Sequence, residues 1–338
     1  MKSASFVLKP RSNPKLLSLV MPLFNEDETI PLLRDRLQDF SKRLPCPAEF
    51  VIVNDGSSDR TAELLTQWAA EDKQLRVLHL ARNFGHQIAA TAGLDAAKGQ
   101  AVVMMDGDLQ DPPDVVLEML SKYRDGYDVV YGQRRKRQGE TVFKRFTAWA
   151  FYRIMRRFVH PQLPVDTGDF RLMSRRCLRA LKGMHETHRF LRGMVAWLGF
   201  AQTSVVFDRP ERLVGETKYP LRKMLRFAWN AMVSFSAMPL RLSLWLGLCV
   251  ASLGFVGGAY SLYRSIVVQD TVPGWTSLIV VSCLLNGATL FCVGLLGEYI
   301  GRIFEESKQR PLYVVAERLN FPKNRKAHRK IRIFKETA

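Results

Sequence analysis

AVVMMDGDLQDPP, residues 101–113, sets a short apolar run directly before a cluster of acidic and amide side chains. An uninterrupted run of this length is typical of a strand that is buried on both faces of a sheet. Asp106 and Asp108 follow where such a strand ends, and Gln110 lies two residues further on. Carboxylate and amide oxygens suit a hard cation, and Mg²⁺ or Mn²⁺ takes a few of them together with substrate phosphates. The stretch predicts either a divalent-metal site at the end of a strand or a solvated turn rich in aspartate.

Other apolar runs repeat this pattern on both sides of the stretch. They are LSLVM (17–21), FVIVN (50–54), LRVLHL (75–80) and YDVVYG (127–132). Helical patterns lie between them, among them residues 26–43 and 59–70. Alternating strands and helices predict a doubly wound, mostly parallel sheet that binds its ligand at the carboxyl ends of the strands. The polar clusters PLFNE (22–26) and NDGSSD (54–59) begin where two of these strands end.

Two long runs without a charged side chain, residues 242–262 and 276–296, stand in the C-terminal part of the chain. Each reaches the ~20 residues that a helix needs to cross a bilayer core. They predict a hairpin of two membrane spans, with buried core helices as the alternative. The link between them holds one Arg, whereas many Arg and Lys residues follow Glu298. The positive-inside rule therefore predicts that both termini are cytosolic.

The formal net charge of +18 predicts an anionic partner: a nucleic acid, a lipid headgroup or a phosphorylated substrate. The five cysteines never form a C-x-x-C pair, which argues against a disulfide framework and a zinc site. Residues 1–16 contain no apolar run, so we expect no signal peptide and a soluble part that stays in the cytosol.

Taken in order, the motifs resemble a known family. P-x-x-N-E (22–26), DGSSD (55–59), R-N-x-G (82–85) and D-x-D-x-Q-D-P-P (106–113) resemble the family 2 glycosyltransferases, whose fold is the nucleotide-diphospho-sugar transferase fold (GT-A-like), an α/β doubly wound mixed sheet. GDFR (168–171) and GETKY (215–219), followed by a two-span hairpin, resemble the polyprenyl-phosphate branch of that family. This branch includes dolichol-phosphate mannose synthases and bactoprenol glucosyltransferases. The resemblance covers residues 16–318, with Asn54 standing where many relatives carry Asp.

The resemblance implies a role for each matching residue. The nucleotide would be bound by Pro22, Asn25, Glu26, Asp55 and Asp106. Asp106, Asp108 and Gln110 would hold Mg²⁺ or Mn²⁺ on the diphosphate, and phosphates would be bound by Arg134, Arg212 and Lys218. The catalytic group would comprise Asp169, Asp166 and Arg171, with Asp169 orienting the acceptor or acting as a base. Each cation alone could equally be an exposed, solvated side chain.

The activity implied is the inverting transfer of a sugar from a nucleotide sugar to polyprenyl (undecaprenyl or dolichyl) phosphate. A UDP-sugar is favoured and UDP-glucose comes first, while aminoarabinose, mannose and a GDP donor remain open. A phosphate monoester is already largely anionic at neutral pH, so the chemistry needs little help from a base and much help in holding two polyanions together. The alternatives are a processive polysaccharide synthase, although the chain has no Arg-Trp pair for a Q-x-x-R-W motif, and an inactive membrane accessory protein.

These patterns together predict an integral protein of the cytoplasmic (inner) membrane. Residues 143–159 and 219–241 mix aromatic and basic side chains, as do helices that lie in the headgroup plane. The expected partners are the nucleotide sugar, polyprenyl phosphate and anionic lipids, with a homo-oligomer possible and no nucleic acid. We expect a flexible N-terminus (1–15), a cytosolic glycosyltransferase domain (16–218), an amphipathic interface helix (219–241), a transmembrane hairpin (242–297) and a basic cytosolic C-terminal tail (298–338).

Overall fold

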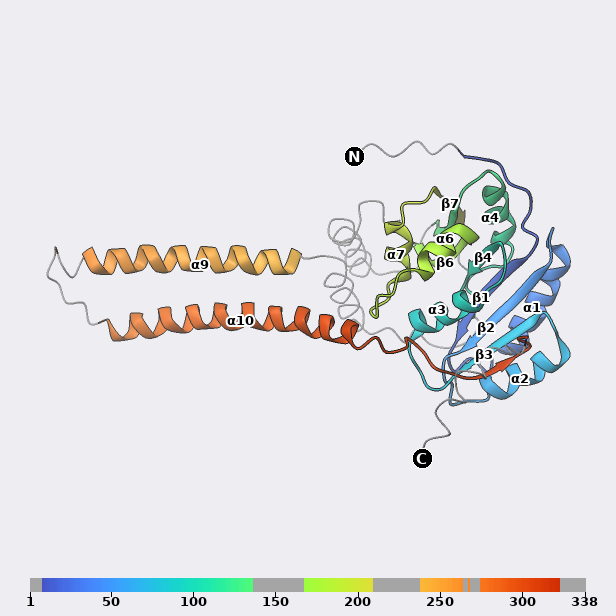
Figure 1. Ribbon diagram of the computed structural model, residues 1–338, viewed down its shortest axis with the longest axis horizontal. Coiled ribbons are helices and arrows are strands. Elements are labelled where there is room, and N and C mark those ends of the chain that lie inside the picture. The colour runs from blue at the N-terminus through green and yellow to red at the C-terminus, as the bar shows by residue number, and fades with distance from the viewer. Residues whose placement is uncertain (1–7, 136–166, 209–237, 264–266, 268–273, 323–338) are drawn as a thin grey trace, which may run out of the picture.

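A sheet covered by helices, followed by two long helices, makes up the computed structural model of the chain (Figure 1). It describes residues 8–135, 167–208, 238–263, 267 and 274–322. The strands are β1 (Leu17–Leu23), β2 (Ala48–Asn54), β3 (Leu75–Leu80), β4 (Ala101–Met104), β5 (Val129–Arg134), β6 (Thr167–Ser174), β7 (Gln202–Phe207) and β8 (Val315–Leu319). The helices are α1 (Ile30–Arg43), α2 (Thr61–Glu71), α3 (His86–Ala96), α4 (Val115–Arg124), α6 (Arg175–Lys182), α7 (Leu191–Trp197), α9 (Met238–Tyr263) and α10 (Trp275–Ser307).

The eight strands form one mixed sheet in the order β7-β5-β6-β4-β1-β2-β3-β8. β1 pairs in parallel with β2 and β4, and β2 pairs in parallel with β3, as the alternation of strands and helices predicted. β6 runs antiparallel between β4 and β5, and β8 runs antiparallel along β3. The predicted doubly wound mixed sheet is confirmed. The segment that carries GDFR is itself a strand, β6, which pairs with β4, the strand that ends just before the D-x-D motif.

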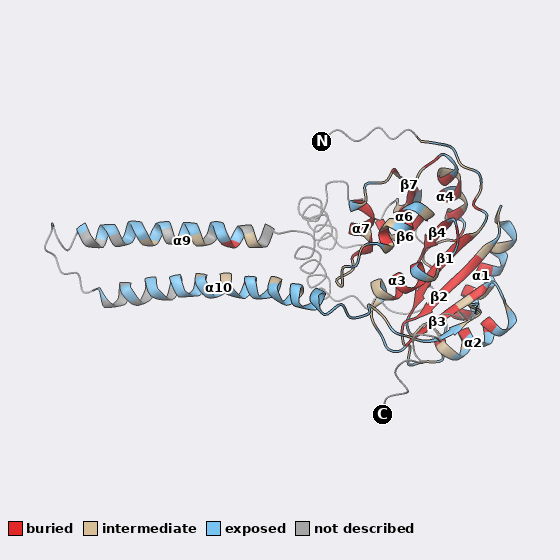
Figure 2. Cartoon of the chain, in the orientation of Figure 1, coloured by how far each residue is buried: buried red, intermediate tan, exposed pale blue. Residues whose placement is uncertain are grey.

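Apolar side chains bury both faces of the sheet, which is why its central strands read as uninterrupted apolar runs. All seven residues of β1 are buried. One face packs under α1, α2 and α4 through residues such as Phe40 and Trp68. The other face packs under α3, α6 and α7, where small residues let α3 approach closely: a Cβ on Gly93 would come within 2.4 Å of Val20 Cγ1. The buried layer runs through the sheet in Figure 2.

The first predicted helix begins later than residue 26. The Thr29 hydroxyl donates to Glu26 Oε2 over 2.8 Å, and the Thr29 N–H donates to the Glu26 carbonyl over 3.0 Å. These bonds close a turn over residues 26–29, and α1 starts only at Ile30. The prediction of a helix from residue 26 is wrong at this end because Asn25 and Glu26 belong to the loop after β1.

The residues expected to be a flexible N-terminus are partly fixed against the sheet. Arg11 donates through its guanidinium to the Gly126 and Tyr127 carbonyls and to Asp128 Oδ1, at 2.9, 3.2 and 3.0 Å. Asp128 is fully buried, so its carboxylate needs cationic partners. Residues 8–15 therefore depart from the expected flexible segment, whereas residues 1–7 lie outside the described part of the chain.

The expected basic tail after residue 297 is in part a helix and a strand. α10 continues to Ser307, with Arg302 paired to Glu298 one turn earlier at 2.8 Å. The chain then returns to the sheet, where β8 pairs with the edge strand β3. The side-chain amide of Asn320 donates to three backbone carbonyls of the sheet domain. Residues 308–322 therefore join α10 to the sheet, and residues 323–338 are not described.

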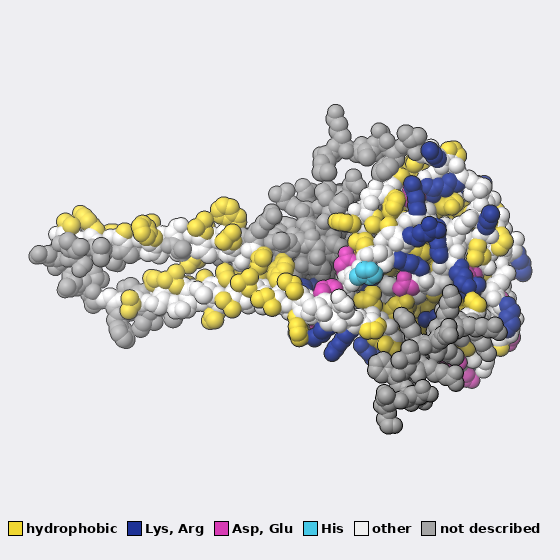
Figure 3. All heavy atoms as spheres, viewed as in Figure 1, with side chains coloured by type: hydrophobic (Ala, Val, Ile, Leu, Met, Phe, Trp, Pro, Cys, Tyr) yellow, Lys and Arg dark blue, Asp and Glu magenta, His cyan; other side chains and the backbone are white. Residues whose placement is uncertain are grey.

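The two predicted spans correspond to α9 and α10, which lie side by side and expose apolar side chains along their length (Figures 2 and 3). Cys292 Sγ lies 3.6 Å from the Ser243 carbonyl, and Ser243 is among the few buried residues of the pair. Of the described residues, one segment, Leu284–Ser307, is both long and apolar enough to cross a bilayer, and the apolar run Leu242–Gly257 is shorter. Residues 219–237 of the expected interface helix, and residues 143–159, lie outside the described residues.

Candidate functional site

The loops after β1 and β2 interlock through polar side chains. Asn25, at φ 54°, donates its N–H to Ser57 Oγ over 3.0 Å and accepts the Ser58 N–H at its Oδ1 over 2.9 Å. The Glu26 N–H donates to Thr61 Oγ1 over 3.0 Å. Side chains of the P-x-x-N-E and DGSSD motifs thus hold the two strand ends in one fixed surface at the carboxyl edge of the sheet, where this class of fold binds ligands.

Asp55 fixes a third loop to this surface. Its carboxylate accepts the backbone N–H groups of Phe84 and Gly85 at 2.8 and 2.9 Å. The residue is 2% exposed, and burial raises the pKa of its carboxyl against the lowering effect of these two bonds. The next residue, Gly56, has φ +66°, and a Cβ there would lie 2.4 Å from the Arg82 carbonyl carbon. Asp55 therefore binds the R-N-x-G loop directly, a role that its assignment to the nucleotide did not include, and Gly56 packs closely against the same loop.

The acidic turn after β4 is built from its own side chains. The Asp106 N–H donates to Asp111 Oδ2 over 3.0 Å, and the Gln110 N–H donates to Asp108 Oδ1 over 3.2 Å. Leu109 adopts φ 61°, and a Cβ on Gly107 would meet Leu23 Cδ2 at 2.1 Å, so the turn packs against the end of β1. Asp111 is buried and shapes the turn, whereas the Asp106 side chain is 29% exposed.

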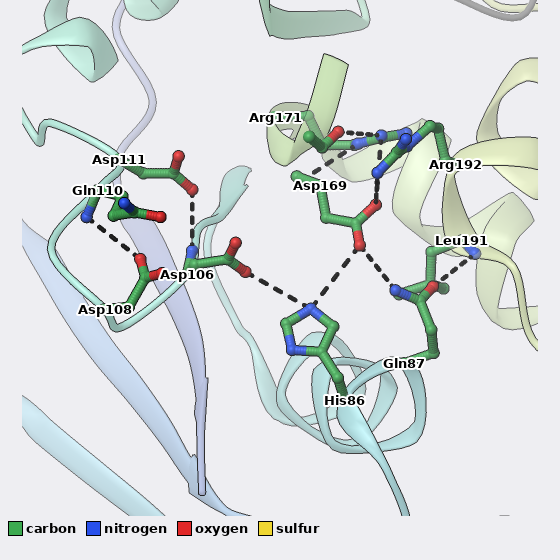
Figure 4. A network of polar contacts seen from close by, with 11 residues as sticks. His86, Gln87, Asp106, Asp108, Gln110, Asp111, Asp169, Arg171, Leu191 and Arg192 are labelled. Carbon is green, nitrogen blue, oxygen red and sulfur yellow. Dashed lines mark hydrogen bonds and ion pairs between the residues drawn. The ribbon is translucent and has the colours of Figure 1, made fainter. Parts of the chain in front are cut away.

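His86, the first residue of α3, lies between the acidic turn and β6 (Figure 4). Its Nε2 is 3.5 Å from Asp106 Oδ1 and 3.7 Å from Asp169 Oδ2. Burial lowers the pKa of the imidazole, but the close Asp169 carboxylate and the charges of Asp106 and Asp55 together raise it to about 9. His86 therefore carries a proton at neutral pH and joins the predicted metal ligand Asp106 to the predicted catalytic Asp169.

Asp169 is enclosed by donors from three elements (Figure 4). The Gln87 amide donates to Asp169 Oδ2 over 2.7 Å and accepts the Leu191 N–H at its own oxygen over 3.0 Å. Arg192 Nη2 donates to Asp169 Oδ1 over 3.3 Å. Arg171 Nη2 lies 3.7 Å from the same oxygen, and the Arg171 guanidinium also donates to the carbonyls of Gly168 and Asp169.

These partners set the charge states of the network. Burial raises the pKa of Asp169, yet the charges of Arg192, Arg171 and His86 outweigh burial and hold that pKa well below its usual range. Burial lowers the pKa of Arg171 to about 10, and the neighbouring Arg192 lowers it as well. At neutral pH the site therefore holds an ionised Asp169 between cations.

The acidic turn offers oxygen ligands alone, which suits a hard divalent cation. Within the described ranges, no group of three or more His, Cys, Asp or Glu side chains is arranged to hold a metal ion. Mg²⁺ needs only one or two carboxylates when substrate phosphates complete its shell. The donors at Asp106, Asp108 and Gln110 therefore fit Mg²⁺ or Mn²⁺ that binds together with a diphosphate.

The structure brings some of the predicted site residues together and leaves others apart. Asp106, Asp169 and Arg171 belong to one network, as described above. Pro22, the last but one residue of β1, is buried beside β2. Arg134 ends β5, and its Nη2 would lie 3.2 Å from a Cβ on Gly168, so its side chain covers the start of β6. Three predicted residues lie outside the described part of the chain: Asp166, Arg212 and Lys218.

Sequence reasoning missed four residues that hold the acidic turn and Asp169 in place, namely His86, Gln87, Asp111 and Arg192. A signal existed for the first two, since they follow the R-N-x-G motif directly at the start of a helix. Asp111 was visible in D-x-D-x-Q-D. Arg192 carries no signal of its own because its place depends on how α7 packs beside α3.

Comparison with known proteins agrees with this architecture. Residues 18–182 match the glycosyl transferase family 2, and residues 238–303 match the GtrB C-terminal hairpin. The uncharacterized glycosyltransferase YkcC of Bacillus subtilis (strain 168) is 45% identical over 298 residues, which cover 88% of this chain and 92% of that protein. The bactoprenol glucosyl transferase of Shigella phage SfV is 40% identical over 300 residues, 88% of this chain and 97% of its own.

Among solved structures, this chain is similar to the mannosyltransferase PcManGT from Pyrobaculum calidifontis in complex with GDP-Man and Mn²⁺. The two sequences are 18% identical and the TM-score is 0.42. The match covers 86% of this chain and 90% of that chain. The sequence matches extend over nearly nine tenths of this chain at identities of 40% and above. They confirm the resemblance read from the motifs. The chain therefore belongs to glycosyl transferase family 2, among the membrane-associated proteins that carry a GtrB C-terminal hairpin.

Proposed function

We propose that this protein transfers glucose, with inversion, from UDP-glucose to the phosphate of a polyprenyl lipid. The observation that carries the proposal is the pairing of an acidic turn with a cation-rich pocket, joined by His86 between Asp106 and Asp169. A nucleotide sugar brings a diphosphate that a metal can neutralise, and a lipid phosphate brings an anion that cations can hold. Relatives of similar length named for glucosyl transfer to bactoprenol support the choice of sugar and acceptor.

Asp106, Asp108 and Gln110 would hold Mg²⁺ or Mn²⁺. When bound, such an ion neutralises the charge that develops on the departing nucleoside diphosphate. The chain's own contribution is to keep these oxygens at the strand end through the bonds of Asp111 and Asp108 within the turn. Asn25 and Glu26, fixed beside Ser57 and Thr61, would form the adjoining nucleotide surface together with Pro22 and Asp55.

For Asp169 we favour orientation of the acceptor over proton transfer. A base must take up a proton, but the charges of Arg192, Arg171 and His86 hold the pKa of Asp169 far below its usual range. The lipid phosphate is largely ionised at neutral pH and needs no deprotonation. Asp169 would instead keep two guanidinium groups at the place where the phosphate enters. Arg134, Asp166, Arg212 and Lys218 are proposed to line the rest of that entry, as the family resemblance implies.

The membrane part would bring this site to the lipid. We propose insertion in the cytoplasmic membrane with the sheet domain and both termini on the cytosolic side, because cations crowd the chain after α10. Those cations, and the basic side chains of residues 143–159 and 219–237, would attract anionic lipids by about 1 kcal/mol for each Lys or Arg near the surface.

A donor panel tests the proposal. Purified protein in detergent receives labelled UDP-glucose, UDP-glucosamine or GDP-mannose with undecaprenyl phosphate and Mn²⁺ or Mg²⁺, and label is counted after lipid extraction. We expect label from UDP-glucose, its loss with a chelator, and a loss of at least about 100-fold in Asp106→Asn. If no donor labels the lipid, the proposal is wrong. A processive synthase would instead yield a polymer, which the size of the labelled product reveals.

A further inference from the structure

Two guanidinium groups share a single carboxylate in this protein. Arg171 and Arg192 both approach Asp169 Oδ1, at 3.7 and 3.3 Å. The three side chains are 4%, 15% and 11% exposed, so water screens them little. His86 adds its Nε2 at 3.7 Å from the other oxygen of Asp169. The pocket therefore sets two guanidinium groups against the single carboxylate of Asp169.

Such a surplus is unfavourable in a largely buried place, because each cation loses hydration and repels its neighbour. An anion that enters the pocket removes the repulsion and makes charge-assisted hydrogen bonds, which are the stronger class. The acidic turn on the other side of His86 has the opposite character, since Asp106 and Asp108 attract a cation. The two halves of the site are thus built for ligands of opposite sign.

The two arginines differ in how far their side chains are exposed. Arg171 is buried and donates to the carbonyls of Gly168 and Asp169, so its guanidinium binds the backbone of β6. Arg192 is the more exposed of the pair and stands in the first turn of α7, with its guanidinium carbon 5.9 Å from the centre of the Phe190 ring. The Gln87 amide fixes the same turn by accepting the Leu191 N–H.

We infer that Arg192 binds a phosphate oxygen of the acceptor, with Asp169 and Gln87 as the residues that position it. A guanidinium fork suits phosphate oxygens, and Arg192 keeps its planar group at the exposed side of the pocket. This inference rests on the proposed function, in which the donor diphosphate belongs with a metal at the acidic turn. The acceptor phosphate is the remaining anion, and the cationic half is the place for it.

The test compares Arg192→Gln and Arg192→Lys with a matched control, Arg179→Gln, which changes an exposed arginine on α6. Initial rates are measured against polyprenyl phosphate and, separately, against the nucleotide sugar. In Arg192→Gln we expect the KM for the acceptor to rise at least about 10-fold, as for a lost hydrogen bond to a charged group, and the KM for the donor to stay unchanged. Arg192→Lys keeps the positive charge but loses the planar guanidinium, so its KM for the acceptor should lie between those of the wild type and Arg192→Gln. Arg179→Gln should have the KM values of the wild type.

An unchanged acceptor KM in Arg192→Gln, or a rise in the donor KM alone, would overturn the inference. Calorimetry of the binding of a short-chain prenyl phosphate needs no turnover. It therefore tests the role of Arg192 separately from the proposed function. If the wild type binds this probe and Arg192→Gln binds it about 10-fold more weakly, Arg192 is a phosphate ligand even when no sugar is transferred. If both bind it equally while the wild type transfers sugar, the proposed function stands and the inference fails.

Discussion

The carboxylate of Glu306, in the last turn of α10, accepts two hydrogen bonds from Thr187, one from its N–H over 2.7 Å and one from its hydroxyl over 3.0 Å. Beside it, His188 Nε2 lies 2.8 Å from Glu305 Oε2. The segment that makes these contacts leads directly into α7, whose first turn contacts Gln87 and Asp169. The end of the long apolar helix is therefore attached to the segment that forms the cationic half of the site.

From this attachment we expect Glu306→Ala to impair transfer to a lipid held in a membrane more than transfer to a soluble acceptor. The pair is exposed, so its loss should cost little stability, about 1 kcal/mol or less. Orientation of the site toward the bilayer should suffer instead, because small displacements of reacting groups are costly. The measurement compares rates with undecaprenyl phosphate in proteoliposomes and with a short, water-soluble prenyl phosphate. We expect a loss of roughly threefold or more in the first assay only.

Glu118→Ala, an exposed acidic position on α4, is the control for Glu306→Ala. It removes a carboxylate of the sheet domain that makes no contact with α10 in the described structure. Equal losses with both acceptors in Glu306→Ala would contradict the role that we assign to the attachment.

Gln87→Glu should disable the site while leaving the fold intact. The Gln87 amide nitrogen donates to Asp169 and the amide oxygen accepts from the Leu191 N–H, so both polar atoms of the side chain are hydrogen-bonded. A carboxylate can still accept from Leu191, but it places a second negative charge against Asp169 at the present 2.7 Å contact. We expect kcat to fall by about 10- to 100-fold, as for other losses of a buried hydrogen bond to a charged group. Gln38→Glu, an exposed amide on α1, is the control and should change kcat little.

The sequence was enough to predict the first five strands, the acidic turn and the hairpin, because each depends on a local pattern. The run before Asp106 is apolar since β4 is buried on both faces, and that burial shows directly in the residue types. The contact between Asp169 and His86 depends instead on the order of the strands. β6 enters antiparallel between β4 and β5, and no spacing between residues 86 and 169 encodes that insertion.

The region after α10 is a second case in which composition misleads. Residues 298–338 are rich in Arg and Lys, which is typical of a solvated tail. β8 nevertheless forms there because its backbone pairs with the edge strand β3, and its charged residues Glu317 and Arg318 stay exposed. Composition describes the side chains of such a strand and gives no information about its backbone pairing.

Gly56→Ala should be more harmful than Gly85→Ala, although both glycines have a positive φ, +66° and +94°. An alanine at either position is strained by about 1 to 3 kcal/mol. At position 56 the new Cβ would also meet the Arg82 carbonyl carbon at 2.4 Å, whereas nothing lies within 4 Å of a Cβ at position 85. We expect a lower thermal midpoint and weaker nucleoside diphosphate binding in Gly56→Ala, measured in detergent by calorimetry. Equal thermal midpoints in the two variants would contradict a stabilising contact between Gly56 and the R-N-x-G loop.

Asp128 should make the stability of the protein depend on pH in the acid range. Its carboxylate is fully buried and accepts bonds from Ser174 Oγ at 2.7 Å, from Arg11 at 3.0 Å and from Arg176. Burial raises the pKa of this carboxyl, but the bonds from Arg176 and Ser174 and the charge of Arg11 outweigh burial and lower it below its ordinary value. Because the folded pKa lies below the unfolded value of about 3.9, the stabilisation is complete above that value and disappears as the pH falls through the folded pKa.

Asp128→Asn should therefore lose about 2 kcal/mol at pH 7, since it removes the buried carboxylate that accepts charge-assisted hydrogen bonds from Arg11 and Arg176. Below about pH 4 the wild type loses the same contribution, so the difference between the two proteins should shrink there. Urea midpoints measured in detergent between pH 3 and pH 7 test this, with Asp125→Asn, an exposed carboxylate at the end of α4, as the control. A constant difference between wild type and Asp128→Asn over this range would mean that Asp128 stabilises the fold through shape alone, because only its ionised form binds Arg11 and Arg176 as an ion pair.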